Sequence, residues 1–269
     1  MISVIVNIYS RNINMIDFSK KNIIITGAGG KIGSKISLYF YQQNANLILI
    51  ENNRSNLINL KKNFEKSMIL NCNLEKLNSI KSTLKQIKKS FSKIDVIIHS
   101  ASLVGTSKLK GWNTNFSNQS IENWDKVFKI NLFSIFYMVQ KLEKMMIKSD
   151  NPSLINIGSI YSKSTPDWEL YKNTNIYNPA AYSSSKAALD YLTKWLAKSV
   201  NKKIRCNMIS PGGIEAEQKK LFKKRYVKKV PLNRMAKVDD LIGPIIFLAS
   251  NMSKYVNGQN IFVDGGFTL

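Results

Sequence analysis

The chain has 269 residues, 44% of them hydrophobic, with 40 Lys and Arg against 17 Asp and Glu. It is long enough to bury a full core and is expected to form one domain, and because no apolar run could span a bilayer we expect no membrane partner. A formal net charge of +23 ordinarily points to nucleic acid, but the lysines are scattered along nearly every segment rather than gathered in one stripe. We therefore expect a solvated basic surface that attracts phosphate-bearing substrates, and no nucleic-acid partner.

The first residues are expected to stand apart from the fold, as an N-terminal arm over 1–18 ahead of a domain over 19–269. Asn7 and Arg11 interrupt the apolar start, so it lacks the core of a signal peptide. Residues 1–14 are interpreted as a mis-assigned start or a loose arm.

The two cysteines, Cys72 and Cys206, stand alone in apolar, strand-like contexts without metal-ligand spacing. This pattern predicts reduced core residues of a cytoplasmic protein and no metal site.

From Lys21 onward, short β-rich runs alternate with amphipathic segments. Strands are expected at 22–26, 47–51, 68–71, 96–99, 154–158, 205–209 and 260–263. Helices are expected near 31–43, 54–65, 75–91, 121–147, 180–200 and 238–250. Nearly continuous apolar strands separated by helices predict an α/β fold: a single doubly wound Rossmann-fold domain, with a seven-stranded parallel sheet and helices on both faces.

Ligands bind such a sheet at the carboxyl ends of its strands. Two loops, 100–119 and 159–181, are longer than a minimal connection needs, and a third, 212–236, is polar and lysine-rich. We expect these loops to carry substrate specificity, with 212–236 as a lid.

A glycine-rich loop follows the first strand and opens the first helix. Its expected cofactor contacts are Gly27, Gly29, Lys31, Ile32 and Gly33. Glycines permit a tight turn and close approach of the backbone to a pyrophosphate, which the helix N-terminus attracts. Any strand-to-helix turn favours glycine, but this placement between a strand and an amphipathic helix favours dinucleotide binding.

Glu51 ends the second strand, where an acidic group accepts the adenosine ribose hydroxyls. Its carboxylate repels a 2′-phosphate, which favours NAD as the cofactor. Lys31 and Arg54 could neutralise that phosphate, so NADP stays an alternative.

Tyr182 and Lys186 lie four residues apart in a segment with helical periodicity, and therefore on one helix face. An ammonium beside a phenol lowers the pKa of the phenol towards a useful range. Alone, such a pair is usually two surface neighbours.

Together, the motifs from Lys21 to the C-terminus resemble the short-chain dehydrogenase/reductase family. The matching residues come in the family's order: the glycine loop, Asn131, Ser159, Tyr182 with Lys186, Arg205-Cys206-Asn207, Pro211-Gly212 and Val263-Asp264-Gly265-Gly266.

The resemblance implies an NAD(P)-dependent oxidoreductase with these residues in catalytic roles. Tyr182 would be the general acid/base, and Lys186 would hold the nicotinamide ribose and lower the pKa of the tyrosine. Ser159 would hydrogen-bond the substrate oxygen, and Asn131 would anchor a water that relays protons.

The resemblance also implies cofactor contacts. Pro211 and Gly212 would bend around the nicotinamide, with the backbone of Ile214 at its carboxamide. Ala101 would approach the adenosine ribose. Asn73, where the family commonly has Asp, would lie at the adenine with Leu74.

The chain departs from the family at several positions. His99-Ser100-Ala101-Ser102 replaces Asn-Asn-Ala-Gly, and only Ala101 matches. Lys31 replaces the second glycine of the loop, and the usual Thr beyond Pro211-Gly212 is missing. His99 is interpreted as a hydrogen-bonding residue at the strand end.

Ser159 and Tyr182 are 23 residues apart, further than is common in the family. The insert offers Trp168 and Tyr171 as stacking surfaces beside Asp167 and Glu169, which suits a sugar better than an acyl chain. It resembles the subgroup of flagellin-modification and surface-sugar oxidoreductases, whose expected substrate is a phosphorylated or nucleotide-linked amino sugar.

Two other functions stay open: a 3-oxoacyl-carrier-protein reductase or generic alcohol dehydrogenase, and a non-catalytic dinucleotide sensor or scaffold. The resemblance also implies a homo-oligomer, a tetramer or dimer, formed through the helices near 121–147 and 180–200.

Overall fold

The computed structural model describes residues 16–105 and 107–269. The expected arm over residues 1–14 lies outside the described residues. Phe18, at the end of the arm as predicted, is buried, and its ring packs edge-on against Phe40 at a centroid distance of 4.8 Å. Among the described residues, Phe18 is thus the first that packs into the core.

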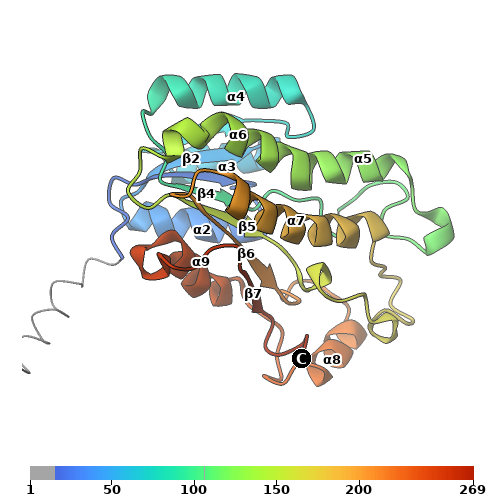
Figure 1. Ribbon diagram of the computed structural model, residues 1–269. Helices are drawn as coiled ribbons and strands as arrows, with labels where there is room; N and C mark the ends of the chain where they lie inside the picture. The colour runs from blue at the N-terminus through green and yellow to red at the C-terminus, as the bar shows by residue number, and fades with distance from the viewer. Residues whose placement is uncertain (1–15, 106) are drawn as a thin grey trace, which may run out of the picture.

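The described chain forms a seven-stranded, wholly parallel sheet in the order β3-β2-β1-β4-β5-β6-β7 (Figure 1). Its strands are β1 Asn22–Thr26, β2 Asn46–Glu51, β3 Met68–Asn71, β4 Val96–His99, β5 Ser153–Ile157, β6 Arg205–Pro211 and β7 Asn260–Val263. The predicted strands are confirmed with shifts of one or two residues at β2, β5 and β6. The fold prediction is confirmed.

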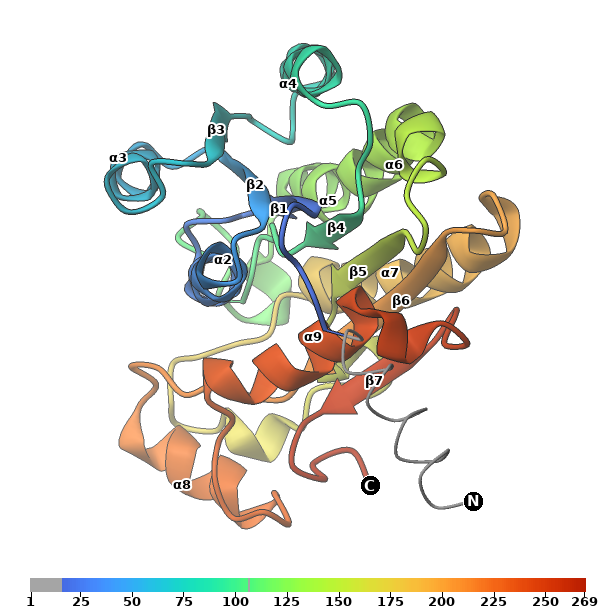
Figure 2. The same ribbon diagram turned by 90° about the vertical axis from the view of Figure 1, so that its left-hand side faces the viewer.

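Helices cover both faces of the sheet (Figure 2). On one side lie α4 Leu77–Ser90, α5 Glu122–Phe128, α6 Ser134–Met146 and α7 Ala180–Ser199. On the other lie α2 Lys31–Gln42, α3 Arg54–Asn63 and α9 Ile242–Ala249. A short helix, α8 Lys220–Lys228, stands beyond the sheet in the loop that the sequence identifies as a lid.

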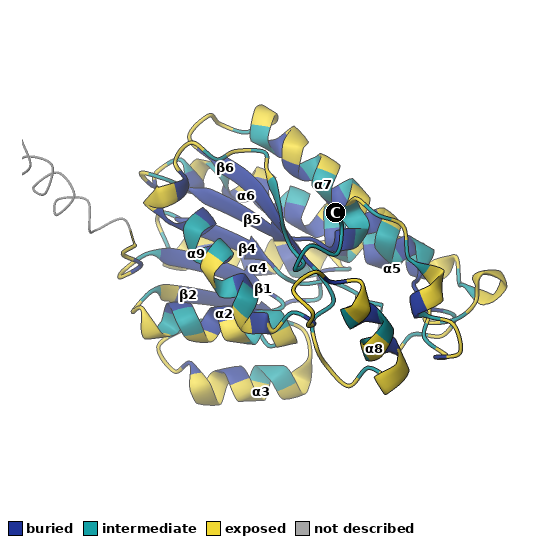
Figure 3. Ribbon diagram, turned by 90° about the horizontal axis from the view of Figure 1, so that it is seen from below, coloured by how far each residue is buried: buried dark blue, intermediate teal, exposed yellow. Residues whose placement is uncertain are grey.

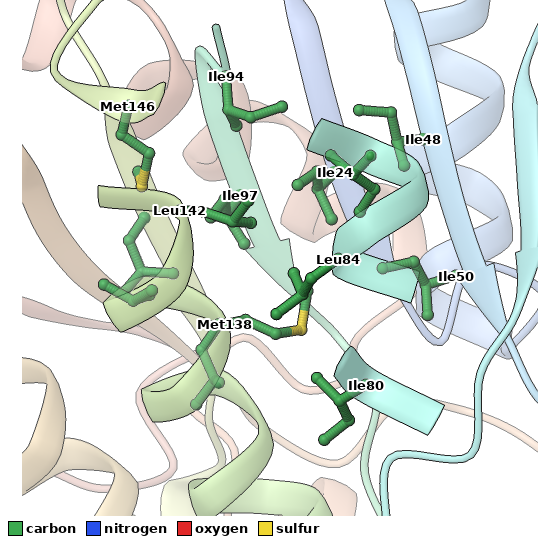
Figure 4. Packing of buried hydrophobic residues seen from close by; sticks show 14 of the residues in the cluster. Ile24, Ile48, Ile50, Ile80, Leu84, Ile94, Ile97, Met138, Leu142 and Met146 are labelled. Carbon is green, nitrogen blue, oxygen red and sulfur yellow. The ribbon is translucent and has the colours of Figure 1, made fainter. Parts of the chain in front are cut away.

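Two cores follow from the alternation of side chains along each strand, because successive residues point to opposite faces. Ile24 packs with Leu84 and Leu142 on the α4–α6 side (Figure 4), whereas Ile23 and Ile25 pack with the α2–α9 side. The central strands β1, β4, β5 and β6 are buried, the edge strands β3 and β7 are partly buried, and the helices expose their outer faces (Figure 3). This burial explains why the strands read as continuous apolar runs.

The sheet has its switch point between β1 and β4, since the chain builds one half outward from β1 and the other from β4. The two strands end side by side, with Thr26 paired in register with His99. A crevice for ligands is expected at this edge.

The opposite ends of β1 and β4 are held together by Asp95, which is 2% exposed. Its carboxylate accepts hydrogen bonds from Asn22 N at 2.9 Å and Ser149 Oγ at 2.6 Å, and it pairs with Lys21 and Lys93. Burial alone would raise the pKa of Asp95, but these bonds and lysines hold it below its ordinary value. Asp95 therefore stabilises the fold above the pKa of the unfolded chain, and this contribution is lost as the pH falls through the folded-state pKa.

Candidate active site

The glycine loop turns tightly at the end of β1. Gly27 has φ +63°, and a Cβ there would lie 2.8 Å from Ala101 Cα. A Cβ on Gly33 would lie 2.1 Å from the Gly27 carbonyl oxygen. Only glycine fits these two positions, so the loop brings its own backbone and that of Ala101 to one place.

Helix α2 begins at Lys31 directly behind this loop. No side chain of the described residues caps it at Gly30, and its first turn contains no acidic residue. Its first N–H groups are therefore available to an anion, and the helix dipole favours negative charge there. Ile32 packs partly buried against the α2–α9 core.

Glu51 borders the same loop from the end of β2. One carboxylate oxygen accepts from Gly29 N at 2.9 Å, and the other accepts from the backbone N–H groups of Asn52 and Asn53 at 2.8 and 2.9 Å. The backbone thus fixes the carboxylate in position. The Oε2 that accepts from Gly29 N keeps one acceptor site for a ribose hydroxyl, whereas the two N–H groups of Asn52 and Asn53 fill the other oxygen.

The residues expected at the adenine follow β3. The Asn73 side-chain oxygen accepts from Glu75 N at 2.9 Å, and the Asn73 N–H donates to Ser79 Oγ at 3.0 Å. Leu74 is buried in the core. The amide oxygen of Asn73 therefore has one partner already and can accept one more hydrogen bond.

His99 and Thr26 lie side by side at the carboxyl ends of β4 and β1, where the ligand crevice is expected. The His99 Nδ1 lies 2.9 Å from Thr26 Oγ1, which also accepts from Ala101 N at 3.2 Å. Burial, with the charge of Lys186, lowers the pKa of His99 to about 3. The ring is therefore neutral near pH 7, and the interpretation of His99 as a hydrogen-bonding residue agrees with this geometry.

Tyr182 lies in the first turn of α7, with Lys186 one turn further on. The Ser159 side chain faces the Tyr182 hydroxyl. Lys186 is 3% exposed, and its Nζ donates to the Ile157 carbonyl at 2.9 Å and lies 5.8 Å from the centre of the Tyr182 ring. Three residues that the sequence analysis selected separately are thus brought together at the end of β5.

The electrostatics of the pair differ from the expectation. Burial raises the pKa of Tyr182, and the contact with Ser159 offsets only part of this rise. Burial also lowers the pKa of Lys186 to about 7. The Lys186 Nζ is bonded to a carbonyl and not to the phenol, so no lowering of the phenol pKa by Lys186 is seen among the protein groups, and the lowering expected with a bound nicotinamide stays a prediction.

Ser159 also begins a short 3-10 helix, Ile160–Ser162, where its Oγ accepts from Tyr161 N at 3.2 Å. Tyr161 is a rival proton donor by proximity, since its ring lies 6.4 Å from that of Tyr182. Burial strongly raises the pKa of Tyr161, and its hydroxyl is bonded to that of Tyr171. Tyr161 therefore serves poorly as an acid or base near pH 7.

Asn131 sits in a π-helical turn, Lys129–Phe133, that interrupts the helix expected over 121–147. It is fully buried, and its side chain donates to Ser185 Oγ at 2.8 Å and accepts from Leu103 N at 3.3 Å. π turns are frequent at functional sites. Because the side-chain amide is already engaged by protein groups, the main chain of the turn is the better candidate to bind a water.

The bend after β6 carries the lid. Gly212 N donates to Val263 O at 3.0 Å, and Gly213 N donates to the Tyr226 hydroxyl at 2.5 Å. Ile214 forms a parallel bridge with Ala236. Tyr226 stacks on Phe267 at a centroid distance of 4.7 Å. Sequence reasoning missed Tyr226 because nothing local marks a tyrosine of α8 as the anchor of Gly213.

The two aromatic residues expected at the substrate contact each other, with ring centroids 5.8 Å apart, but differ in their surroundings. Tyr171 belongs to a small core with Phe222 and Tyr226 of the lid, so it joins the insert to α8. Trp168 is 56% exposed and lines a hollow of about 490 Å³ with Ser183 and Ser184. Those serines follow Tyr182 on α7 and point away from its face, so Trp168 borders the site at its rim.

Other matched motif residues act in the scaffold. The Arg205 guanidinium donates to Asn151 Oδ1, to Ser253 Oγ and to the Leu248 carbonyl. The Asn207 side chain binds Val256 O and Gln259 N. Arg205 therefore fastens β6 to α9 and to the segment before β5, and Asn207 fastens it to the segment before β7.

Comparison with known proteins decides the family. A family model described as "Enoyl-(Acyl carrier protein) reductase" matches residues 27–268. The chain belongs to the short-chain dehydrogenase/reductase family. It is an NAD(P)-dependent oxidoreductase, as the sequence analysis predicted.

Two curated relatives of this short-chain dehydrogenase/reductase span nearly its whole length. A post-translational flagellin modification protein A of Campylobacter coli is 30% identical over 256 residues, covering 93% of this chain and 98% of its own. A 3-oxoacyl-(acyl-carrier-protein) reductase of Thermotoga maritima is 31% identical over 260 residues, with the same coverage.

Solved structures share the fold. A short-chain dehydrogenase from Leptospira borgpetersenii with bound NAD+ is 29% identical, with a TM-score of 0.81 and 94% coverage of both chains. A gluconate 5-dehydrogenase from Burkholderia cenocepacia in complex with NADP and tartrate is 24% identical, with a TM-score of 0.81 and coverage of 95% and 98%.

A dinucleotide fits the residues present. A Cβ would fill the cradle at Gly27 and Gly33, the first turn of α2 offers N–H groups, and the Glu51 carboxylate is fixed beside the loop by Gly29 N. Within residues 16–105 and 107–269, no cluster of three or more His, Cys, Asp or Glu could hold a metal. In the same part of the chain, no helix is both long and apolar enough to cross a bilayer.

Proposed function

We propose that the protein transfers a hydride between a nicotinamide dinucleotide and a carbonyl or secondary alcohol, with Tyr182 as the general acid/base. The observation that carries this proposal is the contact of the Ser159 side chain with the Tyr182 hydroxyl, beside a buried Lys186 whose Nζ lies 5.8 Å from the centre of the Tyr182 ring. The nicotinamide, when bound, supplies or accepts the hydride. The substrate oxygen is bound and the proton is transferred by residues of this chain.

In reduction, Ser159 would donate a hydrogen bond to the substrate oxygen and steady the charge that develops there. Tyr182 would give its proton to that oxygen. Lys186, whose pKa is about 7, exchanges protons readily near neutral pH and would return one to the tyrosine. The main chain of the π turn at Asn131 would hold the water that connects Lys186 to solvent.

We propose NAD as the preferred cofactor. Glu51 supports this, because its carboxylate is fixed by Gly29 N where it would repel a 2′-phosphate. Arg54, the first residue of α3, and Lys31 keep NADP as the alternative. Gly27, Gly29, Ile32 and Gly33 would contact the pyrophosphate. Asn73, Leu74 and Ala101 would contact the adenosine, and Pro211, Gly212 and Ile214 the nicotinamide.

For the substrate we propose a phosphorylated or nucleotide-linked amino sugar, used in surface glycan or flagellin modification. The lid over 212–236 contains eight Lys and Arg against two Glu, which favours an anionic group. Trp168 at the rim offers a stacking face for a remote part of a long substrate. The similarity to a flagellin modification protein supports the same class.

A 3-oxoacyl-carrier-protein reductase is the second candidate, because the same lid could meet an acidic carrier protein and several relatives carry that activity in their names. The test is a screen of nucleotide- and phosphate-linked keto sugars and of acetoacetyl thioesters with NADH and NADPH, and of the corresponding amino sugars carrying free hydroxyls with NAD+ and NADP+. We expect turnover of the sugar compounds with NADH at lower KM than with NADPH. Activity on the thioester alone would contradict the sugar proposal and leave the reaction class intact.

We also propose a homo-oligomer, a dimer or tetramer. On the outer face of α5–α7, Phe133, Tyr191 and Trp195 are 41%, 72% and 47% exposed beside a groove of about 750 Å³. Apolar surface of this kind is typical of subunit contacts. Light scattering should give the mass of two or four chains, and Trp195→Glu should reduce this mass. The mass of one chain at micromolar concentration would contradict the proposal.

We also propose a cytoplasmic location, which the buried thiols of Cys72 and Cys206, free within the described chain, support.

A further inference from the structure

Lys31 connects two segments that are distant in sequence, the glycine loop and the segment after β6, which both belong to the proposed cofactor site. It is the first residue of α2, and its Nζ donates to the backbone carbonyl of Glu215, in the segment after β6. The start of the 212–236 loop is itself fixed to the end of that loop, since Glu215 N donates to Ala236 O at 2.8 Å. The glycine loop and the base of the lid are therefore joined by one cation.

The same contact leads on to the lid helix. The Glu215 carboxylate pairs with Lys223 of α8 at 3.1 Å. Lys31 thus lies at the start of a short chain of contacts that runs through the backbone and side chain of Glu215 to α8. Movement of α8 away from the glycine loop would have to break one of these contacts.

The Lys31 ammonium also lies where a diphosphate is expected, at the open N-terminus of α2. An ammonium has three donors, and the Glu215 carbonyl takes one of them. Two remain for phosphate oxygens. Glu51, the acidic group at this loop, directs its oxygens to backbone N–H groups, so it does not neutralise Lys31.

We propose that Lys31 binds the cofactor diphosphate and, through the Glu215 carbonyl, holds the base of the lid against the bound cofactor. This rests on the dinucleotide binding proposed above. A glycine at this position would offer only its backbone N–H to the diphosphate, whereas Lys31 adds a cationic side chain that can bind it.

The test uses the whole protein and measures binding without turnover. Dissociation constants for NADH, ADP-ribose and adenosine are measured by calorimetry on wild type, Lys31→Met and Lys31→Arg. A charge-assisted bond predicts that Lys31→Met weakens NADH and ADP-ribose roughly tenfold and leaves adenosine, which has no diphosphate, within about twofold. Lys31→Arg should retain most of the affinity.

Lys35→Met is the matched control. Lys35 lies one turn further along α2, is half-exposed, and pairs with Asp239 at 3.4 Å. This variant removes the same charge from the same helix, so it should leave all three constants unchanged.

The lid contact has its own readout. ADP-ribose should protect the segment 215–230 from limited proteolysis in wild type, and this protection should be lost in Lys31→Met. Equal weakening of adenosine and ADP-ribose, or no weakening of either, would overturn the proposal. NADPH is titrated as well, and selective loss of its binding in Lys31→Met with unchanged ADP-ribose would also overturn the proposal, because Lys31 would then serve a 2′-phosphate. A wild-type protein that binds none of the ligands would instead refute dinucleotide binding itself.

Discussion

Replacing Tyr182 by Phe should lower the turnover of the protein by about 10²–10⁴-fold, the usual contribution of a general acid or base. The change removes one hydroxyl and keeps the ring, which packs beside Tyr161. Lys186 bonds the Ile157 carbonyl and not the phenol, so its position should persist. Affinity for NADH, measured by fluorescence titration, should therefore stay within about twofold.

Tyr255→Phe is the control for this prediction. Tyr255 lies in the segment before β7, outside the site and the proposed subunit contact, and is fully exposed, so the same loss of a hydroxyl should leave turnover unchanged. If Tyr182→Phe keeps full turnover, Tyr182 is not the acid/base. If the biological activity survives without turnover, the protein acts as a dinucleotide sensor or scaffold instead.

Gly33→Ala should abolish tight cofactor binding. The added Cβ would lie 2.1 Å from the Gly27 carbonyl oxygen and 3.0 Å from Ala28 Cα, both backbone atoms that cannot rotate away. The loop must therefore shift from its place beside Ala101. We expect NADH affinity to fall at least tenfold and the free energy of unfolding to fall by about 1–3 kcal/mol, as for other overpacked sites.

Gly243→Ala gives the matched control, because a Cβ at Gly243 in α9 meets nothing within 4 Å. There the free energy of unfolding should rise by about 0.5–1 kcal/mol, since alanine favours a helix over glycine, and NADH affinity should not change. An unchanged NADH affinity in Gly33→Ala, with normal folding by circular dichroism, would contradict the assignment of this loop to the cofactor.

Much of the fold could be predicted because its signals are local. Strands such as β1 can be recognised from their apolar runs, since β1 contains three consecutive isoleucines and is buried on both faces. The helix over 121–147 was also predictable, but its π turn at Lys129–Phe133 was not. That turn depends on tertiary contacts of Asn131 with Ser185 and Leu103, which leave no periodic trace in the sequence.

The site was predictable in membership and less so in its electrostatics. Ser159, Tyr182 and Lys186 meet as expected, but the pKa of a phenol depends on burial as well as on the nearest charge. The bond from Lys31 to Glu215 spans 184 residues, and no spacing rule connects such positions. Trp168 was selected because it is an aromatic residue of the insert, and residue type does not tell on which side of α7 a loop residue lies.

The most direct test of the account is to follow deuterium from NADH labelled at the reactive carbon of the nicotinamide into the product. With a substrate found in the screen, wild type should place the label on the carbinol carbon, as mass spectrometry can show, and Tyr182→Phe should form this product far more slowly at equal NADH occupancy. A product formed without the label, or formed equally fast by both proteins, would contradict hydride transfer assisted by Tyr182.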